Sequence, residues 1–155
     1  MSTATTLAWS PELALGDART DTTHEEFTEL VNATSAAAPE NRLPLYQELV
    51  KHTVEHFAQE ERWMTACGIP PDFCHFSQHN SVLEVMREVE RRALLGETAL
   101  IDSMLEALVE WFPQHAQSMD AGLVSYLAEK GFDTASETFN NNTPNETTGV
   151  PSCHP

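Results

Sequence analysis

Basic residues are scarce in this chain of 155 residues, which has 8 Lys and Arg against 24 Asp and Glu and a formal net charge of −16. Nucleic-acid binding depends on clustered Lys and Arg that displace counterions. An anionic membrane surface attracts the same two residue types. The charge balance therefore argues against nucleic acid and against a membrane surface as partners.

Long apolar segments are absent as well. No stretch of about 18 consecutive apolar residues occurs, which is the length that a membrane-spanning helix needs. The first residues also lack the basic segment and the apolar segment of a secretory signal. We therefore expect a cytoplasmic protein that does not span a membrane.

Cysteine is rare, and no two of the cysteines form a C-x-x-C pair. An odd number of cysteines without a secretory signal argues against a disulfide framework. The spacing also excludes a zinc ribbon and a thioredoxin motif. We expect a buried or loop thiol at Cys74, with a redox role as the minor alternative, and Cys153 with His154 could capture a metal or form an intermolecular disulfide.

Apolar residues recur at helical spacing in four stretches, at about residues 22–37, 42–67, 71–95 and 98–130. Asp21 can cap the first stretch, and Gly68, Gly96 and Gly131 can end the other three. No segment alternates with the period of a strand, so we expect no sheet. Short connections between long helices favour antiparallel neighbours, which predicts an all-α, up-down-up-down four-helix bundle.

The bundle is expected to occupy residues 22–132. Residues 1–21 form an N-terminal leader arm, and residues 133–155 form a polar, flexible tail that we expect to be disordered because turn and coil formers dominate it. Pro113 interrupts the fourth helix, where it should cause a kink. The kink is either simply tolerated or helps to aim His115, and the sequence leaves both alternatives open.

Histidines, in part paired with acids, occur on all four predicted helices. Residues four apart lie on one helix face, whereas residues five apart on an α-helix diverge by about 140°. His115 and Asp120 are five apart, so together they need a wide target, such as two metal ions. The residues are His24 on the first helix, His56 and Glu60 on the second, His75 and His79 on the third, and His115 and Asp120 on the fourth.

Each of these pairs alone is a weak signal, because His and Glu are common on helices. The complete set differs, since buried imidazoles and carboxylates without partners are costly and a metal would satisfy them together. Imidazole and carboxylate ligands suit iron, zinc, copper or manganese, and seven ligands are too many for one zinc. Two octahedral ions with bridging carboxylates and a bridging oxygen would leave one position open. His52 and Glu61 are expected to be solvated polar residues rather than ligands.

The motifs around these residues resemble the hemerythrin family, in particular bacterial hemerythrin domains. Trp9, Gly16 and Asp21-x-x-His24 resemble the opening of the family. The segment His52–Met64 resembles its His-Phe-x-x-Glu-Glu-x-x-Met signature and has the sequence H-T-V-E-H-F-A-Q-E-E-R-W-M. The segment W-F-P-Q-H-A-Q-S-M-D resembles its Trp-x-x-x-His-x-x-x-x-Asp motif, although Ala116 stands where a bulky aliphatic is common.

This resemblance implies a non-haem diiron centre, oxo- or hydroxo-bridged, with all seven ligand positions filled. One iron would be bound by His75, His79 and His115. The other would be bound by His24 and His56 and would keep the open position, at which O2 binds. Glu60 and Asp120 would bridge the two ions. The O2 pocket would be apolar and lined by Phe27, Phe57, Trp111 and Phe112.

The resemblance favours reversible O2 binding for storage, delivery or scavenging, without catalysis. Azide or nitric oxide would be further small ligands of the same position. Two alternatives remain open, which are an O2 or redox sensor module and a diiron enzyme that acts on peroxide or nitric oxide. Diiron oxidases generally carry more carboxylates and fewer histidines, so the five-histidine set favours carrying over activating oxygen.

Overall fold

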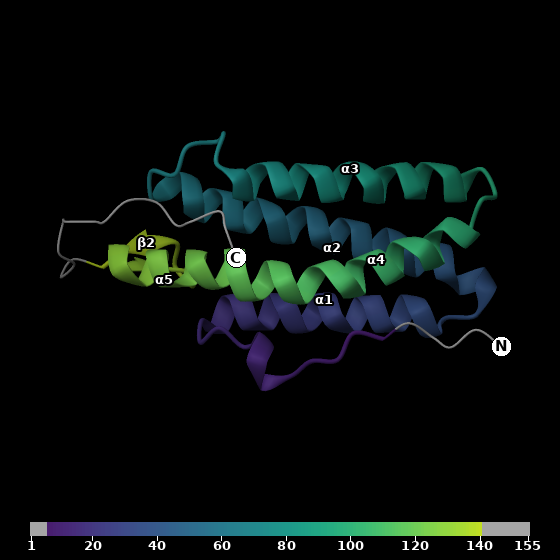
Figure 1. Cartoon of the computed structure of the whole chain (residues 1–155), viewed down its shortest axis with the longest axis horizontal. Coiled ribbons are helices and arrows are strands. Elements are labelled where there is room, and N and C mark those ends of the chain that lie inside the picture. The colour runs from purple at the N-terminus through teal and green to yellow at the C-terminus, as the bar shows by residue number, and fades with distance from the viewer. Residues whose placement is uncertain (1–5, 141–155) are drawn as a thin grey trace.

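Four long helices pack side by side in the computed structural model, which describes residues 6–140 (Figure 1). Each consecutive pair is in contact, and α1 also contacts α4, which closes the bundle. The predicted all-α, up-down-up-down four-helix bundle is confirmed. Its helices are α1 (Ala18–Ala36), α2 (Pro39–Ala66), α3 (Cys74–Leu94) and α4 (Ala99–His115), which continues through a π-helical turn, η2 (Ala116–Asp120), into α5 (Ala121–Lys130).

The first helix begins at Ala18, earlier than the expected Thr22, because Asp17 caps it. One carboxylate oxygen of Asp17 accepts the backbone N–H of Thr20 at 3.0 Å and its hydroxyl at 2.7 Å. Asp21, the expected cap, instead accepts the backbone N–H groups of the preceding loop at Leu15 and Gly16. The cap position therefore shifted by one helical turn.

The described part of the leader packs against α1. It contains a short 3-10 helix, η1 (Pro11–Leu13), and its Leu7 and Leu13 side chains are buried in the core. The side chain of Asn32 on α1 accepts the Leu7 N–H at 2.7 Å and donates to the Leu7 carbonyl at 2.9 Å. These two hydrogen bonds hold the leader along the outer side of α1 (Figure 1).

A small antiparallel hairpin follows α5, so the expectation that the chain has no sheet is wrong. Its strands, β1 (Phe132–Asp133) and β2 (Thr138–Phe139), are two residues long, which is too short to show a period of two in the sequence. Thr134 donates to the Asp17 carboxylate at 2.7 Å, and Trp63 donates to the Glu137 carboxylate at 2.8 Å. The hairpin thus ties the end of α5 to α1 and α2. The rest of the expected tail, residues 141–155, lies outside the described residues.

Two hydrophobic clusters fill the bundle at different levels along its axis. The larger one takes residues from the first half of α2 and most of α4, such as Tyr46, Leu49 and Leu105. The smaller one takes residues from the end of α2 and from α5, such as Trp63 and Leu127. Along α2, the histidine and the acid lie between residues of the larger cluster and residues of the smaller one. The same holds for Asp120 in the segment from α4 to α5. They therefore occupy a polar layer between two apolar layers.

Two further findings concern the described residues as a whole. None of their helices is both long and apolar enough to cross a membrane. The free thiol expected at Cys74 is wrong, because this residue is disulfide-bonded, whereas Cys67 is a buried free cysteine. Cys74 begins α3 and is partly exposed.

Candidate metal centre

The seven side chains singled out in the sequence converge inside the bundle. α1 contributes one, α2 and α3 contribute two each, and the last two come from the end of α4 and from η2. None is more than 3% exposed. They are His24, His56, Glu60, His75, His79, His115 and Asp120.

Glu60 lies between two groups of histidines. Its Oε2 oxygen is 2.9 Å from His56 Nε2 and 3.8 Å from His24 Nε2. Its Oε1 oxygen is 3.1 Å from His79 Nε2 and 3.4 Å from His75 Nε2. The two oxygens of one carboxylate therefore face different histidines.

The two carboxylate oxygens of Asp120 also face different histidines. Its Oδ2 oxygen is 3.1 Å from His24 Nε2. Its Oδ1 oxygen is 3.1 Å from both His75 Nε2 and His115 Nε2. Asp120 and Glu60 together thus bracket two adjacent points, which we name by their histidines. The three-histidine point has His75, His79 and His115, and the two-histidine point has His24 and His56.

The donor atoms at both points fit metal ions. At each point the ligating atoms lie within 4.8 Å of one another, and both carboxylates belong to both groups. Most of these atoms have no hydrogen-bond partner although they are buried, which is costly for polar groups. Imidazole and carboxylate suit first-row transition metals. A pair of such ions would use the Nε2 atoms of His24, His75, His79 and His115 and three oxygens of Glu60 and Asp120, which are the atoms without partners.

The π-helical turn η2 brings His115 and Asp120 onto one face. A π-helix pairs residues five apart, where an α-helix pairs residues four apart. The expected divergence of about 140° assumed α-helical geometry, and this assumption is wrong at η2. His115 Nε2 and Asp120 Oδ1 consequently lie close to each other at the three-histidine point. Pro113 stands inside α4, shortly before this turn.

Both carboxyl groups are held ionised. Burial alone would raise the pKa of Glu60, but the charge of His56 and the close imidazole groups of His24 and His75 lower it well below its usual value. Burial and the charge of Glu60 would raise the pKa of Asp120, but His115 and His24 lower it well below its usual value. The centre therefore presents two anionic bridges.

The histidines facing both carboxylates are basic. Burial lowers the pKa of His24, but the close contacts with Asp120 and Glu60 and the negative charges of these two carboxylates outweigh burial and raise the pKa to about 10. The same balance raises the pKa of His75 to about 9. At His56, burial dominates and lowers the pKa. Metal ions that bind here must displace protons from His24 and His75.

Two residues outside the predicted set orient the ligand rings. The side-chain oxygen of Gln78 accepts hydrogen bonds from His115 Nδ1 and from Trp111 Nε1, the latter at 3.2 Å. Glu61 Oε2 lies 3.2 Å from His79 Nδ1, so the expectation that Glu61 is merely solvated is wrong. Such contacts leave Nε2 free to bind a metal. In the sequence, the one sign of these roles is position: Glu61 directly follows Glu60, and Gln78 directly precedes His79.

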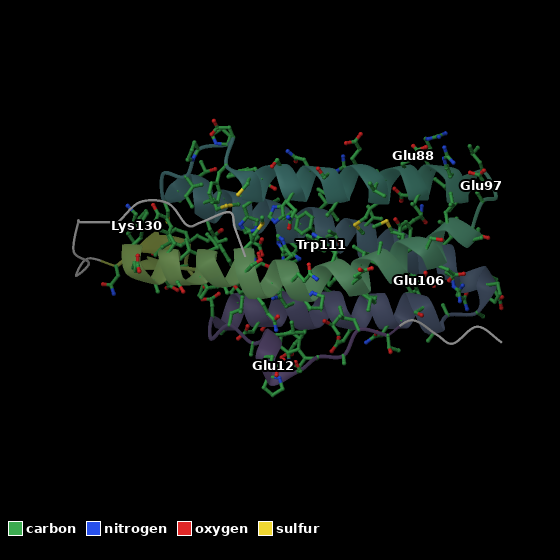
Figure 2. All side chains as sticks on the ribbon, viewed as in Figure 1. Glu12, Glu88, Glu97, Glu106, Trp111 and Lys130 are labelled. Atoms are coloured by element: carbon green, nitrogen blue, oxygen red, sulfur yellow. The ribbon has the colours of Figure 1, made fainter. Side chains whose placement is uncertain are left out.

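The four aromatic residues predicted to line one pocket form two pairs. Phe112 meets the ring of His24 edge-on at 5.0 Å, and Phe27 lies 4.8 Å from Phe112. Phe57 stacks on His79 at 3.9 Å. Trp111 stacks on His115 at 4.4 Å, and Figure 2 shows it near the middle of the bundle. Phe27 and Phe112 therefore border the two-histidine point and Trp111 borders the three-histidine point, whereas Phe57 borders both, because its ring also lies 5.2 Å from that of His56.

The fold and the cluster define a helical-bundle protein with a buried histidine and carboxylate cluster that can hold metal. The model of the hemerythrin HHE cation binding domain matches residues 15–127, which is most of the chain. This chain belongs to the hemerythrin family.

Curated relatives point to the same family. A bacteriohemerythrin of Ralstonia nicotianae is 40% identical over 131 residues, which cover 84% of this chain and 96% of the relative. A bacteriohemerythrin of Pseudomonas paraeruginosa is 28% identical over 76% of this chain and 79% of its own length. A bacteriohemerythrin of Stenotrophomonas maltophilia is 26% identical over 74% of this chain and 76% of its own length.

Proposed function

We propose that this chain binds O2 reversibly at a pair of iron ions held by the seven residues of the cluster. The supporting observation is the inequality of the two points. Five residues surround the three-histidine point and four surround the two-histidine point, with Glu60 and Asp120 common to both. An ion at the two-histidine point has fewer protein ligands, so an external ligand binds there.

The surrounding residues suit a carrier. Phe27 and Phe112 are 1% and 0% exposed and border the two-histidine point, so they exclude water from a ligand there. Gln78 and Glu61 hold two rings of the three-histidine point in place. A ferrous pair, when bound, supplies the two electrons that reversible O2 binding requires. The chain contributes the apolar side chains that exclude water and holds the ligands in fixed positions.

A carrier fits better than an enzyme because of the ligand set. Diiron carboxylate enzymes of helical bundles use four Glu and two His, whereas this cluster has two carboxylates and five histidines. The relatives are also named bacteriohemerythrins. Azide and nitric oxide are expected to compete with O2 for the same position. A cytoplasmic location stays an expectation.

Metal analysis of the purified chain, followed by visible spectra under cycles of O2 addition and removal, tests the proposal. We expect two irons per chain and a charge-transfer band that appears with O2 and disappears on degassing. Azide should diminish the O2-dependent band. Rapid, irreversible oxidation of the iron would favour an enzyme or a redox sensor over a carrier. Absence of iron from a folded chain would refute the diiron centre.

A further inference from the structure

A cavity of about 620 Å³ lies between α1 and α2 on the side of the two-histidine point. Its α1 wall includes Arg19, Thr22 and Glu26, and its α2 wall includes His52 and Glu55. Ala135 of the hairpin completes one end. Neither the ligand set nor the aromatic wall accounts for this cavity.

His56 forms the inner wall of the cavity. The residue is 3% exposed, and its Nε2 atom faces Glu60 Oε2 at the two-histidine point. Its other ring nitrogen, Nδ1, is buried and has no hydrogen-bond partner. The imidazole ring of His56 therefore lies between the cavity and the two-histidine point, and its Nδ1 atom has no hydrogen-bond partner.

The mouth of the cavity carries further donor groups of the same chemistry. Glu26 and Glu55 are exposed carboxylates, and His52 Nε2 lies 3.5 Å from Glu26 Oε1. Carboxylate and imidazole are ligands of divalent first-row metals, and a chain with a net charge of −16 attracts cations. Among the described residues these three do not form a group close enough to hold an ion. They are suited to brief capture rather than to storage.

The histidine rings of the centre differ in how firmly they are held. His79 and His115 each have a side-chain acceptor at Nδ1, from Glu61 and Gln78. His56 has none among the described residues. His24 also has none, but His24 does not line the cavity, so the His56 ring is the one at the cavity that can turn without breaking an outer hydrogen bond. The groove beside Glu61 is a poorer route, because none of the residues that line it is a ligand of the centre.

We propose that this cavity is the route by which a divalent cation, as Fe²⁺, reaches and leaves the two-histidine point, with Glu26, Glu55 and His52 as transient ligands and His56 as the inner gate. The inference rests on the proposed diiron centre. Arg19 lines the same cavity and donates to Gln59 at 3.1 Å. Its positive charge opposes cation passage, so it should slow the passage that the two carboxylates accelerate.

The test is exchange of bound iron for isotopically labelled Fe²⁺ in the loaded, full-length chain under anaerobic conditions. Iron content is measured first in every variant. One of the two ions should exchange in a faster phase, which we assign to the two-histidine point. The double variant Glu26→Gln, Glu55→Gln should slow that phase about tenfold at low ionic strength, and salt should reduce the difference.

Three further variants separate charge from access. Glu106→Gln, Glu110→Gln removes the same charge from exposed positions of α4 that do not line the cavity, and should leave the exchange unchanged. Figure 2 shows Glu106 toward the end of the bundle away from the hairpin. Arg19→Gln should accelerate the fast phase. Thr22→Trp should obstruct the cavity and slow the phase at every salt concentration.

The outcomes distinguish the route from the centre. Equal exchange rates in the Glu26, Glu55 double variant and in the α4 control, at full iron content, would overturn the route and leave the diiron centre standing. Failure of the unmodified chain to hold iron would instead refute the proposed function. A slower fast phase in both the charge variant and the Thr22 variant would establish the route.

Discussion

The Nε2 nitrogen of His115 and the Oδ1 oxygen of Asp120 lie 3.1 Å apart across a single π-helical turn. The turn holds one residue more than an α-helical turn would, and this extra residue brings the carboxylate round to the histidine. α5 then continues as a regular helix and packs Leu123 and Leu127 into the smaller hydrophobic cluster. The turn thus serves the metal centre and preserves the bundle.

Inserting an alanine after Ser118 should place Asp120 six residues after His115, a spacing that neither an α-helical nor a π-helical turn brings onto one face, and so remove Asp120 from the centre. We expect loss of metal binding, while circular dichroism shows nearly unchanged helix content. The control Ser118→Ala keeps the turn length and should bind metal normally, since it removes only a partly exposed hydrogen bond to Gln114. An insertion variant that still holds two metal ions per chain would contradict this role of the turn.

Replacing His56 by Ala should empty the two-histidine point and leave the three-histidine point filled. The reason is that only His24 and His56 supply nitrogen there, whereas three histidines remain at the other point. Elemental analysis should show one metal ion per chain, and O2-dependent spectral changes should disappear. Lys51→Ala, at an exposed position of the same helix that does not line the cavity, is the control. Two ions at full occupancy in the His56 variant would show that His56 is not a ligand.

Gln78→Leu should weaken metal binding without touching a ligand. The change removes the acceptor that orients His115 and leaves the Trp111 N–H unpaired. Loss of such an outer partner typically lowers metal affinity by about 10- to 100-fold. Gln78→Glu keeps an acceptor oxygen and should restore most of the affinity in competition titrations with a chelator. Equal affinities in the Leu and Glu variants would refute the orienting role.

The metal-free chain should lose stability as pH rises from about 6.5 to 10. The pKa of His24 is raised to about 10 and that of His75 to about 9, above the ordinary histidine value of about 6.5. A histidine whose pKa is raised in the folded chain stabilises the fold fully at pH values below its pKa in the unfolded chain. This stabilisation is lost as the pH rises through its pKa in the folded chain. Urea midpoints over this range should decline for the stripped chain.

The metal-loaded chain serves as the control for this pH series. Metal ions replace the protons of His24 and His75, so its urea midpoint should not decline over the same range. Metal uptake at neutral pH should also release protons, which a weakly buffered indicator solution would detect. A stripped chain whose midpoint stays constant to pH 10 would mean that these histidines are not protonated partners of Glu60 and Asp120.

Much of the fold was predictable because it depends on local pattern. Apolar spacing predicted the bundle, and glycines marked helix ends, as at Gly96 and Gly131, where φ is +104° and +69°. The cap at Asp17 was missed because several suitable residues follow one another there. The hairpin was missed because its strands are shorter than any detectable period.

The sequence by itself determined the chemistry of the candidate centre. Ligand types and their spacing within each helix are local properties, so His56 and Glu60, or His75 and His79, were predictable as pairs on one face. Their number and type also determined the class of metal.

Only the tertiary structure decided how these pairs combine. Whether an oxygen of Glu60 faces His56 or His79 depends on how α2 packs against its neighbours, and the π-helical turn at Asp120 departs from the regular geometry that sequence spacing assumes. The outer contacts of Gln78 and Glu61 and the cavity beside His56 likewise join residues of different helices. Such relations arise from packing between helices, which periodicity within one helix does not encode.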